Sequence, residues 1–184
     1  MARARRAQDA VEARVVVRSF RAGDGVAASQ VMVEAFRTFI PAAHQEIVFR
    51  GFAAESLEAA SLPARGDRSS VAYVAAAGGR LLGYVRGSAS YFGFGTLGVI
   101  GVSPDHLHEG VGSLLMRQML RYWRRQGMRK VSTSVSAHNA RAFQFYHKHG
   151  FRPVGYQRDH FMEGVDEVIL DLFLARRRTG SGAR

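Results

Sequence analysis

The chain has 184 residues, of which 47% are hydrophobic and none is cysteine. This length suits a single domain with a sizeable core, and the lack of cysteine excludes disulfides, thiolate metal sites and a cysteine nucleophile. The formal charge is +11, of which residues 1–14 carry +2 and residues 175–184 carry +4. The remaining +5 suits either an anionic ligand or a solvated arginine-rich surface, so charge alone assigns no function.

Composition also bears on location and on domain boundaries. No stretch approaches the ~20 consecutive apolar residues of a membrane helix. The N-terminus is basic but lacks the apolar run and cleavage site of a secretory signal, so we expect a cytoplasmic protein. Residues 1–13 and 175–184 have no burial pattern and are expected to be flexible tails around one domain at 14–174. The seven histidines show no metal-binding spacing, so we expect no metal site.

The first third of the domain predicts one strand and two helices. The β-branched stretch "RVVVRSF" is bounded by a turn at "RAGDG". Apolar residues then recur at helical spacing as far as a proline. The expected elements are a strand at 14–20, a helix capped by Asp24 and ended by Pro41, a loop at 40–50, and a helix at 52–62 that stops before Pro63.

The middle of the chain predicts consecutive strands. After a turn at "GDRSS", the stretches "VAYVAAA" and "RLLGYVRGSAS" are joined by Gly78 and Gly79, which is typical of a tight hairpin. The stretch "GTLGVIGV" follows as a further strand. Residues 93–98, "GFGTLG", match the dinucleotide pattern G-x-G-x-x-G, but no helical periodicity begins at Gly98. We therefore interpret them as a strand connection and not as a nucleotide site.

The last third predicts a helix after "HEGVG", a strand "KVSTSV", a second helix and two closing strands. Gly127 is expected to terminate the first helix. The second is expected to begin at Asn139 and to end at Gly150. The whole order predicts one mixed α/β domain, with a central, mostly antiparallel sheet of about seven strands flanked by about four helices.

Gly110 and Gly112 open the stronger helix directly after a strand and a turn. The first turn of a helix leaves backbone N–H groups unpaired, and the helix dipole favours an anion there. Glycine removes the Cβ atoms that would keep a phosphate away. No Gly-Lys-Ser/Thr follows, so the motif is not a P-loop. The two glycines alone favour neither an anion cradle nor a simple close contact between helix and strand.

A second motif lies about thirty residues further on, in "NARAFQFYHKHGF". Together with "SPDHLHEGVGSLL" it resembles the GNAT superfamily of acyl-CoA N-acyltransferases, from about residue 14 to 174. The family's pyrophosphate loop is similar to Arg/Gln-x-x-Gly-x-Gly/Ala, and a glycine often follows the Arg or Gln. This chain departs from the pattern, because Leu107 stands in place of the Arg or Gln and His108 in place of that glycine. If the cradle exists, the resemblance therefore implies that backbone N–H groups carry most of it. The second motif is matched at Asn139, Ala142, Phe145, Tyr146, Gly150 and Phe151.

The resemblance implies an N-acetyltransferase that uses acetyl-CoA as co-substrate and a primary amine as acceptor, by direct attack in a ternary complex. Tyr146 is implied to be the general acid that protonates the leaving CoA thiolate. The strand "GVIGV" is implied to splay open and to hold the pantetheine arm. The implied coenzyme-binding residues are Ile100, Val102, His108, Glu109, Gly110, Val111, Gly112, Ser113, Asn139, Ala142 and Tyr146. Without the resemblance, Asn139 reads as an ordinary N-cap and Tyr146 as a core aromatic.

The general base and the acceptor stay open at this stage. Neither of the two expected central strands, "GTLGVIGV" and "KVSTSV", contains a carboxylate side chain. The segments 40–50 and 156–167 are expected to shape the acceptor site. Candidates for the base are Glu46, His44, His138, Asp159 and His160.

Two alternatives to catalysis remain. A non-catalytic acyl-CoA-binding module is the main one, and a nucleic-acid binder that uses the arginine tails has no supporting motif. A homodimer is a hypothesis that rests on the resemblance alone.

Overall fold

The structure, a computed structural model, describes residues 15–62 and 69–174. The expected tails, the helix stop at Pro63 and the first part of the turn at 66–70 lie outside the described residues. None of the helices in the described ranges is long and apolar enough to cross a membrane.

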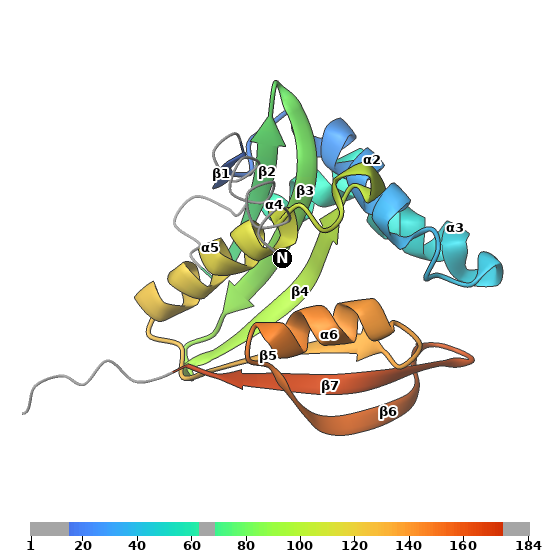
Figure 1. The fold of residues 1–184 in the computed structure, drawn as a ribbon, viewed down its shortest axis with the longest axis vertical. Coiled ribbons are helices and arrows are strands. Elements are labelled where there is room, and N and C mark those ends of the chain that lie inside the picture. The colour runs from blue at the N-terminus through green and yellow to red at the C-terminus, as the bar shows by residue number, and fades with distance from the viewer. Residues whose placement is uncertain (1–14, 63–68, 175–184) are drawn as a thin grey trace, which may run out of the picture.

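The described residues form seven strands, five α-helices and one short 3-10 helix, in the arrangement of Figure 1. The expectation of one mixed α/β domain with a seven-stranded sheet is confirmed. In chain order the elements are β1 (Val16–Ser19), α2 (Gly25–Phe36), α3 (Ala42–Gly51), α4 (Ala54–Ser61), β2 (Ser70–Ala77), β3 (Arg80–Ala89), β4 (Phe94–Val102), η1 (Pro104–His106), α5 (Val111–Arg125), β5 (Lys130–Ser136), α6 (Ala140–Lys148), β6 (Arg152–Met162) and β7 (Val165–Phe173).

The seven strands form one sheet in the order β1-β2-β3-β4-β5-β7-β6. Every neighbouring pair is antiparallel except β4 and β5, which are parallel. Successive side chains of a strand point to opposite faces, so the two faces of the sheet pack into two separate hydrophobic cores. On β2, Tyr73 and Ala75 pack in a cluster with α5, whereas Ala72 and Val74 pack with α2 and α4. The helices α5 and α2/α4 therefore cover opposite faces of the sheet.

Two local expectations are wrong. Asp24 stands at the N-cap position of α2, but its side chain makes no capping hydrogen bond. Its carboxylate instead accepts two hydrogen bonds from the Arg18 guanidinium, at 2.6 and 2.8 Å, and one from the Arg21 backbone N–H. The expected loop at 40–50 is mostly the helix α3, which brings the α-helices of the described residues to five.

The stretch "GFGTLG" lies in the β3–β4 turn and in β4, and no helix opens there. A Cβ built on Gly95 would come within 2.8 Å of the Trp123 ring, whose Nε1 donates to the Ser88 carbonyl. At Gly95 the missing side chain therefore makes room for the tryptophan of α5. The interpretation as a strand connection is confirmed.

Candidate functional site

The sheet opens between its two parallel strands. Pairing of β4 with β5 covers only Phe94–Thr96 against Lys130–Ser132, although β4 continues to Val102 and β5 to Ser136. At the point of divergence the Thr133 hydroxyl donates to the Leu97 carbonyl at 3.0 Å. Figure 1 shows the two halves of the sheet meeting at one corner and separating toward α3. Beyond Thr96, the edge of β4 that faces β5 therefore has no strand partner among the described residues.

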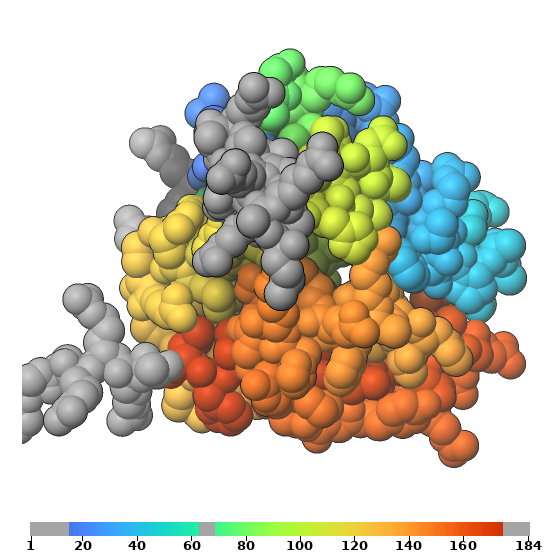
Figure 2. Space-filling model, in the orientation of Figure 1, coloured from blue at the N-terminus to red at the C-terminus, as the bar shows by residue number. Residues whose placement is uncertain are grey.

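A cavity of about 710 Å³ occupies this opening. Its wall includes part of β4, the start of α5, the facing side of α6 and the end of β5. In Figure 2 an opening is visible where the yellow-green, orange and blue segments meet. We call the part remote from α5 the apolar end, which is lined by Phe36, Phe39, Ile40, Val48, Phe52, Leu57, Phe161 and Met162.

The N-terminus of α5 forms one wall of the cavity. No side chain caps this helix, and the first turn of any helix leaves its N–H groups without intrahelical acceptors. Gly110, the N-cap, has φ +87°, a conformation that glycine adopts without strain. A Cβ on Gly112 would lie 3.3 Å from Cε2 of Phe145, so this glycine lets α5 and α6 approach closely. The uncapped turn faces the cavity, and close packing accounts for Gly112.

The turn before α5 carries the departures from the family pattern. His108 has φ +66°, a left-handed conformation that is costly for a residue with a Cβ. It is exposed and lines the rim of the cavity, as does Leu107. Glu109 is the one expected coenzyme-binding residue that does not line the cavity, and its carboxylate pairs with Nδ1 of His106 at 2.9 Å. The strained histidine stands where the family pattern often has a glycine.

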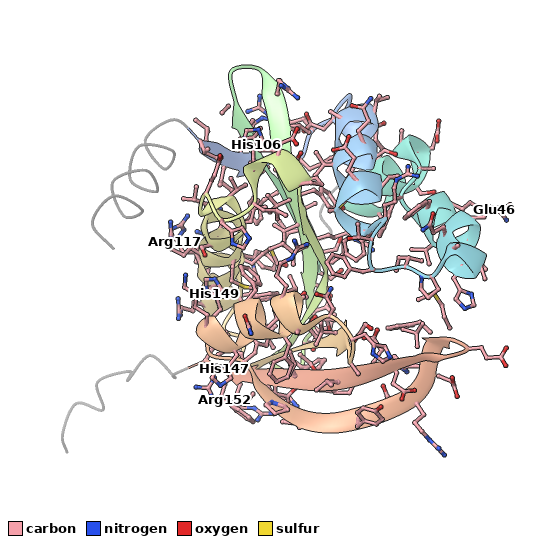
Figure 3. The ribbon with its side chains drawn as sticks, turned by 45° about the vertical axis from the view of Figure 1, so that its right-hand side comes forward. Glu46, His106, Arg117, His147, His149 and Arg152 are labelled. Atoms are coloured by element: carbon pink, nitrogen blue, oxygen red, sulfur yellow. The ribbon has the colours of Figure 1, made fainter. Side chains whose placement is uncertain are left out.

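A histidine links α5 to α6 beside the uncapped turn. Ser113 Oγ lies 3.2 Å from Nε2 of His149, and the His149 ring stacks edge-on against Phe145 at 4.7 Å. Burial, together with the positive charges of Lys148 and Arg117, lowers the pKa of His149. The imidazole is therefore neutral at neutral pH. Figure 3 shows His149 at the junction of the two helices.

Helix α6 positions the expected tyrosine. Asn139 caps it, because its Oδ1 accepts a hydrogen bond from the Ala142 backbone N–H at 3.0 Å. Asn139, Ala142 and Tyr146 all line the cavity. Tyr146 is only 7% exposed and packs edge-on against Phe145 and Phe151. The tyrosine is therefore both a core aromatic and a cavity residue.

The environment of Tyr146 keeps its phenol protonated. Burial raises the pKa of Tyr146 to about 12, and the negative charge of Glu167 acts in the same direction. A hydrogen bond with the Thr133 side chain opposes this shift without cancelling it. A buried phenol of this kind can donate a proton to an anion that forms beside it.

Sequence reasoning missed a carboxylate in the cavity. Glu167 on β7 lies opposite Ser136 of β5, lines the cavity and is 7% exposed. Burial raises the pKa of Glu167, which a hydrogen bond with Ser134 and the charge of His160 partly oppose. Asp171 on the same strand is neutralised by Lys130 Nζ at 2.7 Å, whereas Glu167 makes no ion pair with a described residue. A signal existed in the alternation of β7, where Glu167 falls on a buried face.

The five side chains expected as candidate bases lie elsewhere, since none of them lines the cavity. Glu46 is exposed and pairs with Arg50 at 3.0 Å, on the outer part of α3 in Figure 3. Nε2 of His44 lies 3.1 Å from the Glu163 carbonyl oxygen, and His138 and His160 are exposed. Oδ1 of Asp159 accepts a hydrogen bond from the Gly164 backbone N–H.

The two segments expected to shape the acceptor site do reach the cavity. Segment 40–50 contributes Ile40 and Val48, and segment 156–167 contributes Phe161, Met162, Val165 and Glu167. Within the described ranges, no group of three or more His, Cys, Asp or Glu side chains is arranged to hold a metal.

Known structures share this fold. The N-acetyltransferase PaiA of Thermoplasma acidophilum, solved in complex with coenzyme A, matches with a TM-score of 0.75 and 18% identity, over 87% of this chain and 99% of that one. The ribosomal-protein-S18-alanine N-acetyltransferase of Escherichia coli matches with a TM-score of 0.71 and 17% identity, over 92% and 99%. A GCN5-related N-acetyltransferase of Kribbella flavida gives 0.70 and 18%, over 89% and 99%. At these identities the likeness establishes the fold alone.

Sequence comparison supplies the family. No curated protein matches the chain. The model of the acetyltransferase (GNAT) family matches residues 33–151, which is more than half of the chain and spans the opened strands, the uncapped helix and Tyr146. The chain therefore belongs to the acetyltransferase (GNAT) family of acyl-CoA-dependent N-acyltransferases.

Proposed function

We propose that the chain transfers an acetyl group from acetyl-CoA to a primary amine, which attacks the thioester directly in a ternary complex. One observation carries the proposal. A single cavity joins the uncapped start of α5, the unpaired edge of β4, and two buried proton-transfer groups, Tyr146 and Glu167. The structural match to an N-acetyltransferase solved with coenzyme A supports the choice of donor.

The donor binds through backbone groups. The N–H groups of residues 108–113, that of Glu109 included, receive the pyrophosphate, and the positive end of the α5 dipole favours its charge. This route suits a chain with a leucine at position 107, because it needs no cationic side chain there. Within the part of the chain that the structure describes, no strand pairs with the edge of β4 near Ile100 and Val102, so this edge is available to the amide groups of the pantetheine arm. An N–H group of that edge stabilises the oxyanion, a contribution typically worth ~10²–10³ in rate.

Tyr146 is the general acid in this mechanism. When the tetrahedral intermediate collapses, the C–S bond breaks and the sulfur leaves with the electron pair. A phenol with a pKa of about 12 carries its proton throughout the neutral range and can donate it to that thiolate. Asn139 and Ala142 contribute by starting α6 at the cavity wall, which sets the position of Tyr146 two turns later.

Glu167 is the general base that the sequence did not reveal. An amine arrives largely as an ammonium ion, so a group at its side of the thioester must accept a proton. On β7, Val168, Leu170 and Leu172 pack toward the core of α5, so Glu167 projects from the opposite face. Tyr146 approaches from the α5 and α6 face. The amine therefore enters from the side of Glu167 while the sulfur departs toward Tyr146.

The test is release of CoA thiol from acetyl-CoA across a panel of amines. We expect Tyr146→Phe to lower kcat by ~10²–10⁴ while acetyl-CoA affinity changes little. Tyr91→Phe is the matched control, because the Tyr91 side chain is fully exposed. Acetyl-CoA binding without thiol release for any amine would instead identify a non-catalytic module. Equal activity of the Tyr146→Phe and Tyr91→Phe variants would remove Tyr146 from the mechanism.

A further inference from the structure

Three cationic side chains line the cavity, those of Arg86, Arg141 and Lys148, and none of them forms an ion pair with a described residue. The Arg141 guanidinium stacks over the Phe39 ring at 4.8 Å. Arg86 lies on β3 between Ala72 of β2 and Val99 of β4, in the middle of the sheet, and its side chain lines the cavity. Its Nε is buried and has no hydrogen-bond partner. The Arg86 side chain as a whole is half-buried. A buried N–H donor without an acceptor is unfavourable in a folded protein, and a ligand that accepts from it removes that cost.

The side chain of Arg86 projects toward the apolar end. Residues 84 and 86 of β3 share a face, and Tyr84 packs in the cluster formed with α2 and α4. The Tyr84 hydroxyl lies 2.7 Å from Ser61 Oγ of α4, and the charge of Arg86 acts on that phenol. The Arg86 side chain therefore projects from the sheet face that α2 and α4 cover, which is also the face from which Glu167 projects.

The nearby carboxylates do not neutralise it. Glu58 of α4 is engaged with the N-terminal region of α2, where its Oε1 accepts hydrogen bonds from the Gly23 and Gly25 backbone N–H groups at 2.8 and 3.3 Å. Glu167 forms no ion pair with Arg86. The cavity thus holds a carboxylate and a guanidinium on one sheet face, each without an ionic partner among the described residues.

We infer that the acceptor is an amine that also carries an anionic group, which Arg86 binds. The inference rests on the proposed function. A guanidinium presents a planar fork of N–H donors that matches a carboxylate or a phosphonate. Glu167 meets the amino end of such a molecule and Arg86 meets its anionic end. The aromatic side chains of the apolar end, Phe36, Phe39 and Phe52, suit an apolar body between or beside these two groups.

Matched acceptors test the inference by activity. L-Phenylalanine, its amide and 2-phenylethylamine share one body and differ in charge, and the phosphonate analogue of phenylalanine separates the two kinds of anion. We expect the wild type to prefer one of the anionic acceptors over the neutral ones by at least ~10-fold in kcat/KM, the size typical of a hydrogen bond between charged groups. Arg86→Gln is expected to abolish that preference, because it lowers kcat/KM for the anionic acceptors far more than for the neutral ones. Arg80→Gln, at the exposed start of β3, is the control.

Binding gives a second readout that does not require turnover. In the presence of CoA, 3-phenylpropanoate or 3-phenylpropylphosphonate is expected to raise the thermal unfolding midpoint of the wild type and not of Arg86→Gln. Three results would overturn the inference while acetyl transfer stands. They are equal use of neutral and anionic amines, an equal loss for both in Arg86→Gln, and no stabilisation of the wild type by either anion. If no acyl-CoA binds at all, the proposed function fails first and the inference fails with it.

Discussion

Replacing Glu167 with glutamine removes one charge and keeps the shape of the side chain. The amide oxygen can still accept the Ser134 hydroxyl proton, so the packing at β5 and β7 is preserved. A general base typically contributes ~10²–10⁴ in rate, which corresponds to about 3–5 kcal/mol at 1.36 kcal/mol per tenfold. We expect Glu167→Gln to lower kcat/KM for the amine at least ~100-fold, with little change in KM for acetyl-CoA.

The pH dependence gives a sharper readout than the rate alone. The carboxylate is the active form of the base, so wild-type kcat/KM rises with pH through the pKa of Glu167, which burial raises above its ordinary value. This limb is expected to be absent from the variant. The free energy of unfolding is expected to change with pH in the opposite direction to the rate. Because the folded-state pKa is the higher one, folding favours protonated Glu167, and this stabilisation is lost as pH rises through that pKa. The variant should therefore gain stability relative to the wild type as pH rises.

The assay combines pH–rate profiles with thermal unfolding over the same pH range. Glu163→Gln is the matched control, because Glu163 lies exposed in the β6–β7 turn. An unchanged rate in Glu167→Gln, or an acidic limb that persists in it, would refute the assignment of Glu167 as base. A rate loss equal to that of the control would do the same.

Two further predictions concern the backbone around the site. His108→Gly relieves a left-handed backbone conformation that costs about 1–2 kcal/mol, and the greater freedom of glycine in the unfolded chain offsets about 0.5–1 kcal/mol of this gain. The thermal unfolding midpoint should therefore rise, by roughly 2–4 °C for each kcal/mol gained. A lower midpoint in the variant would contradict the claim that the backbone at His108 is strained. Gly95→Ala drives a Cβ against Trp123 and should cost about 1–3 kcal/mol in denaturant unfolding, whereas Gly51→Ala, with no atom within 4 Å, should cost far less. Equal stability of the two alanine variants would contradict the packing argument.

The elements that could be predicted from the sequence are those encoded by local pattern. The hairpin of β2 and β3 follows from two apolar stretches joined by Gly78 and Gly79, both of which have positive φ. Helix α5 follows from its apolar stripe and from Gly127, which takes the left-handed conformation after its end. Helix α3 was missed because none of its residues is buried, so no apolar face marks it.

The residues of the candidate site also differ in whether a local sequence pattern could predict them. The uncapped turn before α5 and the tyrosine of α6 follow motifs that a sequence displays, since each depends on residues within one or two turns of chain. Asn139 illustrates this, because its capping hydrogen bond joins atoms only three residues apart. Helix chemistry of this kind is local and therefore readable.

The sequence by itself determined the fold class and the family motifs, and the family resemblance of those motifs pointed to Tyr146 as the general acid. Only the tertiary structure decided which charges share the cavity with Tyr146. Glu167 reaches it because β7 inserts beside β5, and Arg86 reaches it because β3 pairs with the strand that splays away. The physical reason is that strand order and the opening of the sheet arise from contacts between segments far apart in the chain. No local pattern records those contacts.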